Sequence, residues 1–145
     1  MRKVLFLLMF PIIYFSQESD SIYVSKDFNK AIANIRTIKV WLNDDYLNNN
    51  IPRYIYDQFI IVLENNENRL NELNSKNEKK LNYLYSKVDI NGFLNSFKIM
   101  KDWLIQDYSS GEISKKIYDE YNLVLNNTYL GFKMILSDSV ICCSN

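Results

Sequence analysis

A string of residues in the middle of the chain returns 62 positions later, and this repeat limits the possible folds more than any other feature. The first copy reads Trp41-Leu42-x-x-Asp45-Tyr46 and the second reads Trp103-Leu104-x-x-Asp107-Tyr108. Aligned without gaps, residues 35–65 and 97–127 share twelve identities over thirty-one positions, far more than unrelated segments share by chance. We therefore expect the chain to build the same structural unit twice.

Each copy has the residue spacing of two amphipathic helices, because apolar residues recur every three or four positions and so share a helix face. In the first copy they are Phe28, Ile32, Ile35, Ile38 and Leu42, then Ile55, Phe59, Val62 and Leu63. In the second copy they are Phe93, Phe97, Met100, Leu104 and Tyr108, then Tyr118, Tyr121, Leu125, Phe132 and Ile135. Only three Gly and two Pro are present, which disfavours a turn-rich all-β fold. The sequence predicts an all-α protein of two tandem αα-hairpins packed as a four-helix bundle.

Capping and breaking residues set the expected helix limits. The first helix can be capped by Ser25 or Asp27 and fades into residues 44–50. The second opens at Ile51-Pro52 and runs to about residue 86, with a break near residues 74–77 as the alternative. The third stops at residues 109–111, and the fourth is capped by Ser114 and ends near residues 137–139.

The bend of the second copy resembles the short helical hairpin of SHOCT-type modules. The residues that carry this resemblance are Gly111, Ile113, Ser114, Tyr118 and Leu125. The resemblance covers only residues 104–125, and the first copy departs from it with Asn49 and Pro52 at the Gly and Ser positions. It implies a helix–turn–helix bend and does not assign the chain to that family.

The N-terminus is typical of a secretory signal peptide, because basic Arg2 and Lys3 precede an uncharged apolar run from Val4 to Phe15. This run is shorter than the about 20 residues that a membrane-spanning helix needs. We expect export to the periplasm or the extracellular space, with no stable membrane span once the signal is cleaved. An uncleaved anchor or an apolar N-terminal strand is the alternative. The expected organisation is a signal peptide (1–16), a flexible lead-in (17–24), a helical domain of two repeats (25–86 and 87–139) and a tail (140–145).

The repeated residues divide by expected role. Those spaced as core are Leu42/Leu104, Ile55/Ile117, Val62/Val124 and Leu63/Leu125, with Trp41/Trp103 covering the edge of the core and Tyr46/Tyr108 packing at the bend. Those that can form exposed ion pairs four positions apart are Arg53 with Asp57 and Lys115 with Asp119. Asp45 and Asp107 stand near helix C-termini, where negative charge is unfavourable. Their recurrence predicts a partner, such as the N–H groups that begin the next helix, or Arg53 and Lys115.

Several kinds of chemistry are disfavoured by composition. The chain has no His, which removes the usual general base and the commonest metal ligand. It has no Gly-rich phosphate loop, no EF-hand spacing and no basic patch on a chain of zero formal charge. Paired carboxylates could still act as acid and base, and the candidates are Asp45, Asp57, Asp107 and Asp119. We expect a protein that is not an enzyme and that uses no cofactor, no metal and no nucleic acid.

The two copies differ at positions that suggest a binding surface. Tyr54 and Ile60 of the first copy stand where the second copy has Lys116 and Asn122. This extra apolar surface indicates either a more central helix or a site that meets a protein partner, so Tyr54 and Ile60 are the candidate interaction residues.

Cys142 and Cys143 form a second candidate feature near the C-terminus. Adjacent cysteines bond to each other only with strain, so the options are an apolar tail, an intermolecular disulfide or a metal site. Together with the export signal, these features predict an exported, non-catalytic binding protein, such as an inhibitor or an immunity-type protein, that is a monomer or a weak dimer. The alternative is a structural or assembly component of the cell envelope, tethered or disulfide-linked, and an enzyme using carboxylates ranks third.

Overall fold

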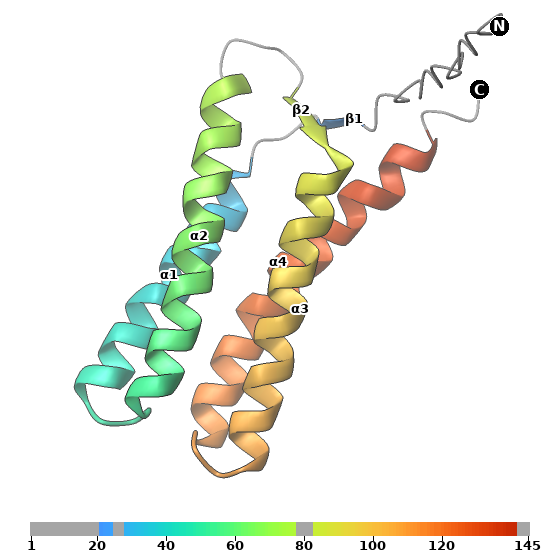
Figure 1. Cartoon of the computed structure of the whole chain (residues 1–145). Coiled ribbons are helices and arrows are strands. Elements are labelled where there is room, and N and C mark those ends of the chain that lie inside the picture. The colour runs from blue at the N-terminus through green and yellow to red at the C-terminus, as the bar shows by residue number, and fades with distance from the viewer. Residues whose placement is uncertain (1–20, 25–27, 78–82, 142–145) are drawn as a thin grey trace, which may run out of the picture.

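The computed structural model describes residues 21–24, 28–77 and 83–141, and four long helices dominate this part of the chain (Figure 1). They are α1 (Asn29–Leu47), α2 (Arg53–Asn77), α3 (Lys87–Ser109) and α4 (Lys115–Ile141). The helices pack together around one apolar core, so the predicted all-α class is confirmed. The fourth helix extends past its expected end near residues 137–139.

The helices meet along two seams between the hairpins. Within each hairpin, α1 runs antiparallel to α2 and α3 runs antiparallel to α4, while α1 lies beside α4 and α2 lies beside α3 (Figure 1). We call the second pair of contacts the α1–α4 seam and the α2–α3 seam. Residues 62 positions apart in the aligned copies are called counterparts.

The core is built from the apolar stripes that the sequence predicts. Its fully buried members include Ile35, Ile38, Leu42, Phe59, Leu63, Leu70, Ile90, Phe97, Met100 and Leu125. Trp41 and Trp103 are half-buried and pack against this core, as expected from their position beside the stripe. A cluster of four Phe rings adds to the core, with Phe132 at 5.3 Å from Phe28 and 5.1 Å from Phe93 between ring centroids.

The two bends have the same backbone geometry. In the first, the N–H of Asn50 donates to the carbonyl of Asp45 (2.8 Å) and the N–H of Asn49 donates to that of Tyr46 (3.1 Å). Glu112 and Gly111 make the matching bonds in the second bend. This pattern needs one left-handed residue after the helix, which is Asn49 (φ 58°) in one bend and Gly111 (φ 80°) in the other. Asn and Gly are the residues that adopt this conformation at least cost.

Stacked tyrosines close both bends. Tyr46 stacks on Tyr56 with ring centroids 4.6 Å apart, and Tyr108 stacks on Tyr118 at 4.7 Å. The predicted ion pairs follow directly along the chain: Arg53 pairs with Asp57, and Lys115 pairs with Asp119. Ser114 caps α4 as predicted, because its hydroxyl accepts the N–H of Ile117.

A short antiparallel ribbon joins β1 (Ser21–Val24) to β2 (Tyr83–Ser86), with Ser21 opposite Ser86 and Val24 opposite Tyr83. The prediction of one continuous helix over 53–86 is wrong, and the alternative, in which the helix breaks near residues 74–77, is correct. Residues 21–24, expected to be the end of a flexible lead-in, form the strand β1. Ser86 ends the ribbon and caps α3 by accepting the N–H groups of Val88 and Asp89.

Three predictions fall outside the described residues: the signal peptide at 1–16, the cap at Ser25 or Asp27, and the state of Cys142 and Cys143. Within the ranges 21–24, 28–77 and 83–141, no helix combines the length and the apolar character that crossing a membrane requires.

Candidate functional site

The first candidate interaction residue, Tyr54, lies in the first turn of α2 with about half of its surface exposed (51%). Ile60, the second candidate, is half-buried and packs against the core, while the next residue, Ile61, is exposed. Burial, and then the negative charges of Glu112 and Asp107, raise the pKa of Tyr54. Tyr54 therefore lies within electrostatic range of the bend between α3 and α4.

On the opposite seam, the recurring aspartate is well supplied with hydrogen bonds. The hydroxyl of Tyr121, which reaches from α4, donates to Oδ2 of Asp45 on α1 at 2.8 Å. The side-chain amide of Asn50 donates to Oδ1 of the same carboxylate at 3.0 Å. The predicted partner of Asp45 is thus a tyrosine hydroxyl and a neighbouring amide, whereas Arg53 bonds to Asp57 instead. Two donors offset the unfavourable position of this charge at a helix C-terminus.

The counterpart of this aspartate has lost both donors. The counterpart of Tyr121, which donates to Asp45, is Phe59, which has no hydroxyl. The counterpart of Asn50, the second donor to Asp45, is the acid Glu112. Asp107 is buried (7% exposed), and in the described part of the chain its Oδ2 has no hydrogen-bond partner. Lys115, the base once expected to pair with Asp107, bonds to Asp119. Asp107 therefore combines burial, a helix C-terminus and a second acid nearby.

The aromatic rings beside these two aspartates show the same difference. Tyr121 stacks on Trp41 with an interplanar angle of 21° and ring centroids 6.1 Å apart. Phe59 lies at a similar 5.8 Å from Trp103, but the two rings meet edge to face at 66°. The hydroxyl that fixes Tyr121 against Asp45 is absent from Phe59, so that ring is free to turn to the edge-to-face contact.

Electrostatics follow from this arrangement. Burial, and then the charge of Glu112, raise the pKa of Asp107 above the ordinary value of a carboxyl group. Glu112 itself is exposed in the bend that follows α3. Asp107 and Glu112 lie at the bend between α3 and α4, and their negative charges act on Tyr54 in the first turn of α2. We call these three residues, one aromatic ring and two acids, the Tyr54 surface.

A second pair of counterparts differs in the same direction. On the α1–α4 seam, the amide of Asn34 donates to the hydroxyl of Thr128 at 2.9 Å. The matching residues on the α2–α3 seam are Ser96 and Asn66. Asn66 is buried (7% exposed) and its Nδ2 has no partner in the described residues, while the Ser96 hydroxyl donates to the carbonyl of Gly92 in its own helix. The polar bond that crosses one seam is missing from the other.

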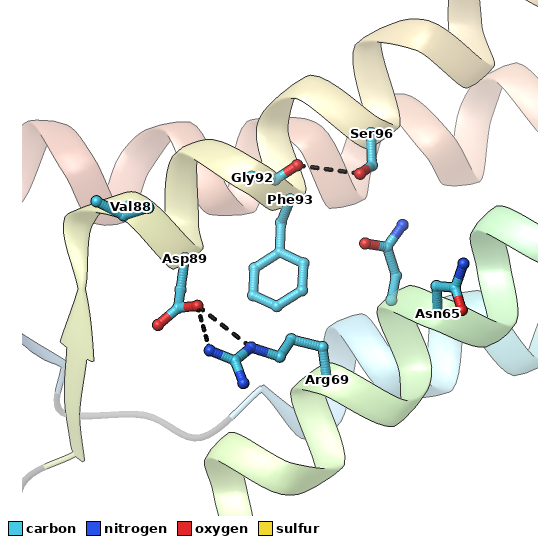
Figure 2. Close-up of a pocket in the computed structure, with 8 residues that line it drawn as sticks. Asn65, Arg69, Val88, Asp89, Gly92, Phe93 and Ser96 are labelled. Carbon is cyan, nitrogen blue, oxygen red and sulfur yellow. Dashed lines mark hydrogen bonds and ion pairs between the residues drawn. The ribbon is translucent and has the colours of Figure 1, made fainter.

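An open pocket of about 240 Å³ lies along the α2–α3 seam, away from the bends (Figure 2). Its lining residues are Asn65, Asn66, Arg69, Val88, Asp89, Gly92, Phe93 and Ser96. Figure 2 shows the Phe93 ring pointing from α3 toward α2. The Arg69 guanidinium donates across the seam to Asp89 (2.8 Å) and along its own helix to Glu72 (3.1 Å). Because these charges are already paired, the pocket offers a ligand amide groups and an aromatic wall rather than a free charge.

The four carboxylates considered for acid–base chemistry are not brought together in this pocket. Asp57 and Asp119 hold exposed ion pairs on their own helices, and none of the four lines the pocket. In the ranges that the structure describes, no group of three or more acidic or Cys side chains is placed to hold a metal ion.

Comparison with family models, with curated proteins and with solved structures finds no match for this chain.

Sequence reasoning missed Glu112, Phe59 and Asn66 as parts of the site. The 62-residue offset between the two copies contains a signal for all three, because each stands where the other copy has a residue that forms a hydrogen bond. What the alignment cannot show is that residue 121 meets Asp45, a contact that spans 76 positions in the chain.

Proposed function

We propose that this chain is an exported, non-catalytic helical protein that acts by binding another protein, for example as an inhibitor or an immunity-type protein. In this proposal residues 1–16 form a signal peptide that is removed on export. The remaining chain is a duplicated αα-hairpin whose two copies form a four-helix bundle. The α2–α3 seam of this bundle contains the binding site.

The observation that supports binding is the concentration of unsatisfied polar groups on one seam. Among the described residues, Asp107 and Asn66 on the α2–α3 seam each have a buried polar atom without a hydrogen-bond partner, whereas their counterparts are bonded. Leaving a buried polar atom without a hydrogen bond costs about 1–3 kcal/mol. Selection for stability alone would remove such groups, and functional surfaces are where they are retained. The half-exposed Tyr54 lies in the first turn of α2, one of the two helices of this seam, and Tyr is enriched in protein interfaces.

Site-specific photocrosslinking in the producing cell tests this proposal. A photoreactive phenylalanine at position 54 is expected to give a discrete adduct with one partner protein. The matched control is the same residue at position 116, the counterpart on α4. Equal adducts at both positions, or none at either, would contradict the proposal. The mass of the recovered chain tests export separately, since loss of residues 1–16 is expected.

A second function, as an assembly component of the envelope, is favoured by the outer face of α4. Leu123, Leu130 and Met134 are 62%, 44% and 63% exposed and are spaced so that they share one helix face. Sedimentation of the full chain distinguishes the two functions. If the wild type forms higher oligomers and the Leu130→Lys variant does not, assembly is supported. A monomer at high micromolar concentration would contradict it. Non-reducing electrophoresis of a Cys142→Ser, Cys143→Ser variant shows whether a disulfide contributes.

A further inference from the structure

The Tyr54 surface carries an inference about the chemistry of the partner, which rests on the proposed binding function. Its central feature is the Oδ2 atom of Asp107, which is buried and has no hydrogen-bond partner in the described residues. Its counterpart Asp45 shows what such a carboxylate takes up when the fold provides for it, namely two donors. The Asp107 carboxylate therefore has unused acceptor capacity.

The surroundings of Asp107 select the kind of donor that can fill this capacity. Glu112 adds a second negative charge, and both acids lie close enough to raise the pKa of Tyr54. No described base pairs with Asp107 or Glu112, because Arg53, Lys115 and Lys116 are each paired with an acid one helical turn further along α2 or α4. The surface is thus acidic and lacks a cation of its own.

The counterpart positions show that the missing cation is a difference between the copies. Lys116 stands on α4 at the position where α2 carries Tyr54. The Tyr54 surface thus has an aromatic ring where the other copy has a base. It also has Phe59 where the other copy has the hydrogen-bonding Tyr121, and the acid Glu112 where the other copy has the neutral Asn50. All three differences favour the arrival of a positive charge from outside.

We propose that the Tyr54 surface accepts a lysine or arginine side chain of the partner protein. The cation would lie against the ring of Tyr54 and donate hydrogen bonds to Asp107 and Glu112. Because this oxygen is buried, the Asp107 carboxylate would have to rotate about a side-chain bond to reach the cation. Charge-assisted hydrogen bonds formed in a partly buried site are stronger than those at an open surface, so the partner's base would act as an anchor.

The test is a nuclear magnetic resonance titration of the carboxylate groups in the full chain with N-acetylarginine amide. The Asp107 carboxylate resonance is expected to shift, and its pKa to fall, while the neutral analogue N-acetylcitrulline amide has no effect. The Asp45 resonance is the internal control and is expected to stay unchanged, because its acceptors are already occupied.

Two variants copy the other half of the molecule into this surface. Tyr54→Lys supplies an internal base and is expected to abolish the response. Glu112→Asn removes one acid and is expected to weaken binding by about two- to fivefold, the range of a single exposed charge pair. Circular dichroism confirms that each variant is folded.

Three outcomes would overturn the inference: equal shifts at Asp45 and Asp107, an unchanged response in Tyr54→Lys, or a response to Mg²⁺ at lower concentration than to the arginine probe. The last would mean a metal site. Failure of this inference is distinguishable from failure of the proposed function. A crosslink at position 54 without an arginine response supports protein binding and refutes the cation as its anchor. An arginine response without any crosslink supports the cation site and refutes the protein-binding function.

Discussion

The two seams between the hairpins use matching positions but treat their polar residues differently. Along the α1–α4 seam, Tyr121 bonds to Asp45 and Asn34 bonds to Thr128. Along the α2–α3 seam, neither matching bond forms, and within the part of the chain that the structure describes Asp107 and Asn66 each have a buried polar atom without a partner. The apolar core is shared by both seams, so packing alone does not account for the difference. The comparison teaches that one seam is built for stability, while the other has kept polar groups that stability does not require.

The largest expected effect comes from making the α1–α4 seam resemble the other one. Tyr121→Phe leaves the ring in place but removes the hydroxyl that bonds to Asp45, which keeps the Asn50 amide as its remaining donor. A hydrogen bond to a charged group contributes about 1.5–3 kcal/mol, and we expect the free energy of unfolding to fall by about 2 kcal/mol in urea denaturation. The control is Tyr118→Phe, at a half-buried ring stacked on Tyr108, with an expected change within about 0.5 kcal/mol. Equal losses in the two variants would mean that the Asp45 bond does not stabilise the seam.

The reverse substitution tests the α2–α3 seam. Phe59→Tyr supplies the hydroxyl that Asp107 lacks, and we expect a gain of about 1 kcal/mol together with a lower pKa of Asp107. The control is Phe97→Tyr, at a fully buried ring, where an unpaired hydroxyl is expected to cost about 1–3 kcal/mol. If Phe59→Tyr is as damaging as Phe97→Tyr, the two seams do not share the geometry that the comparison assumes.

A smaller gain is expected from rebuilding the second polar bond. The double variant Ser96→Asn with Asn66→Thr places on the α2–α3 seam the pair that bonds across the α1–α4 seam. We expect a rise in the free energy of unfolding of about 0.5–1 kcal/mol, since one neutral hydrogen bond contributes about that much. Thr128→Val, which breaks the existing bond, is expected to lower stability by a similar amount. A double variant less stable than the wild type would show that Asn66 already has a compensating role.

The smallest effect is a dependence of stability on pH. The pKa of Asp107 is raised in the folded state by burial and by Glu112, so the folded protein holds this proton to higher pH than the unfolded chain does. The contribution of Asp107 is therefore complete below the ordinary carboxyl pKa and is lost as pH rises through the raised value. The stability of the wild type relative to Asp107→Asn is expected to decline over this interval in urea denaturation.

Glu67 provides a control of opposite sign. Burial alone would raise its pKa, but hydrogen bonds from Arg36 and Lys39 lower it below the ordinary value. Its contribution is present above the unfolded pKa and is lost as pH falls, so the stability of the wild type relative to Glu67→Gln is expected to increase with pH. A flat profile for Asp107→Asn beside a rising one for Glu67→Gln would refute the assignment of a raised pKa to Asp107.

Much of the fold could be predicted because it depends on local patterns. The apolar stripes, the caps, the left-handed residue after each helix and the ion pairs four positions apart are all set by neighbours in sequence. The ribbon could not be predicted in this way. Leu81, Leu84 and Val88 continue the helical spacing of α2, and the partner strand of Tyr83–Ser86 is Ser21–Val24, far earlier in the chain.

The candidate site was predictable only in part. The comparison of the two copies pointed to Tyr54, which is exposed, but also to Ile60, which packs against the core. A difference between copies marks a change of environment without saying whether the residue faces outward or inward. Asp107 was expected to have a partner because Asp45 and Asp107 recur together, yet the partner of Asp45 comes from another helix, and Phe59 does not provide one for Asp107.

The ribbon has a mechanical consequence for this site. It joins the strand before α1 to the strand before α3, at the opposite end of the molecule from the two bends (Figure 1). Because the ribbon links the two hairpins at one end, rotation of one hairpin against the other about the ribbon would displace the bend end most. Tyr54, Asp107 and Glu112 lie at that far end, so any swing of one hairpin against the other about the ribbon would change their spacing more than it changes the spacing of residues near the ribbon.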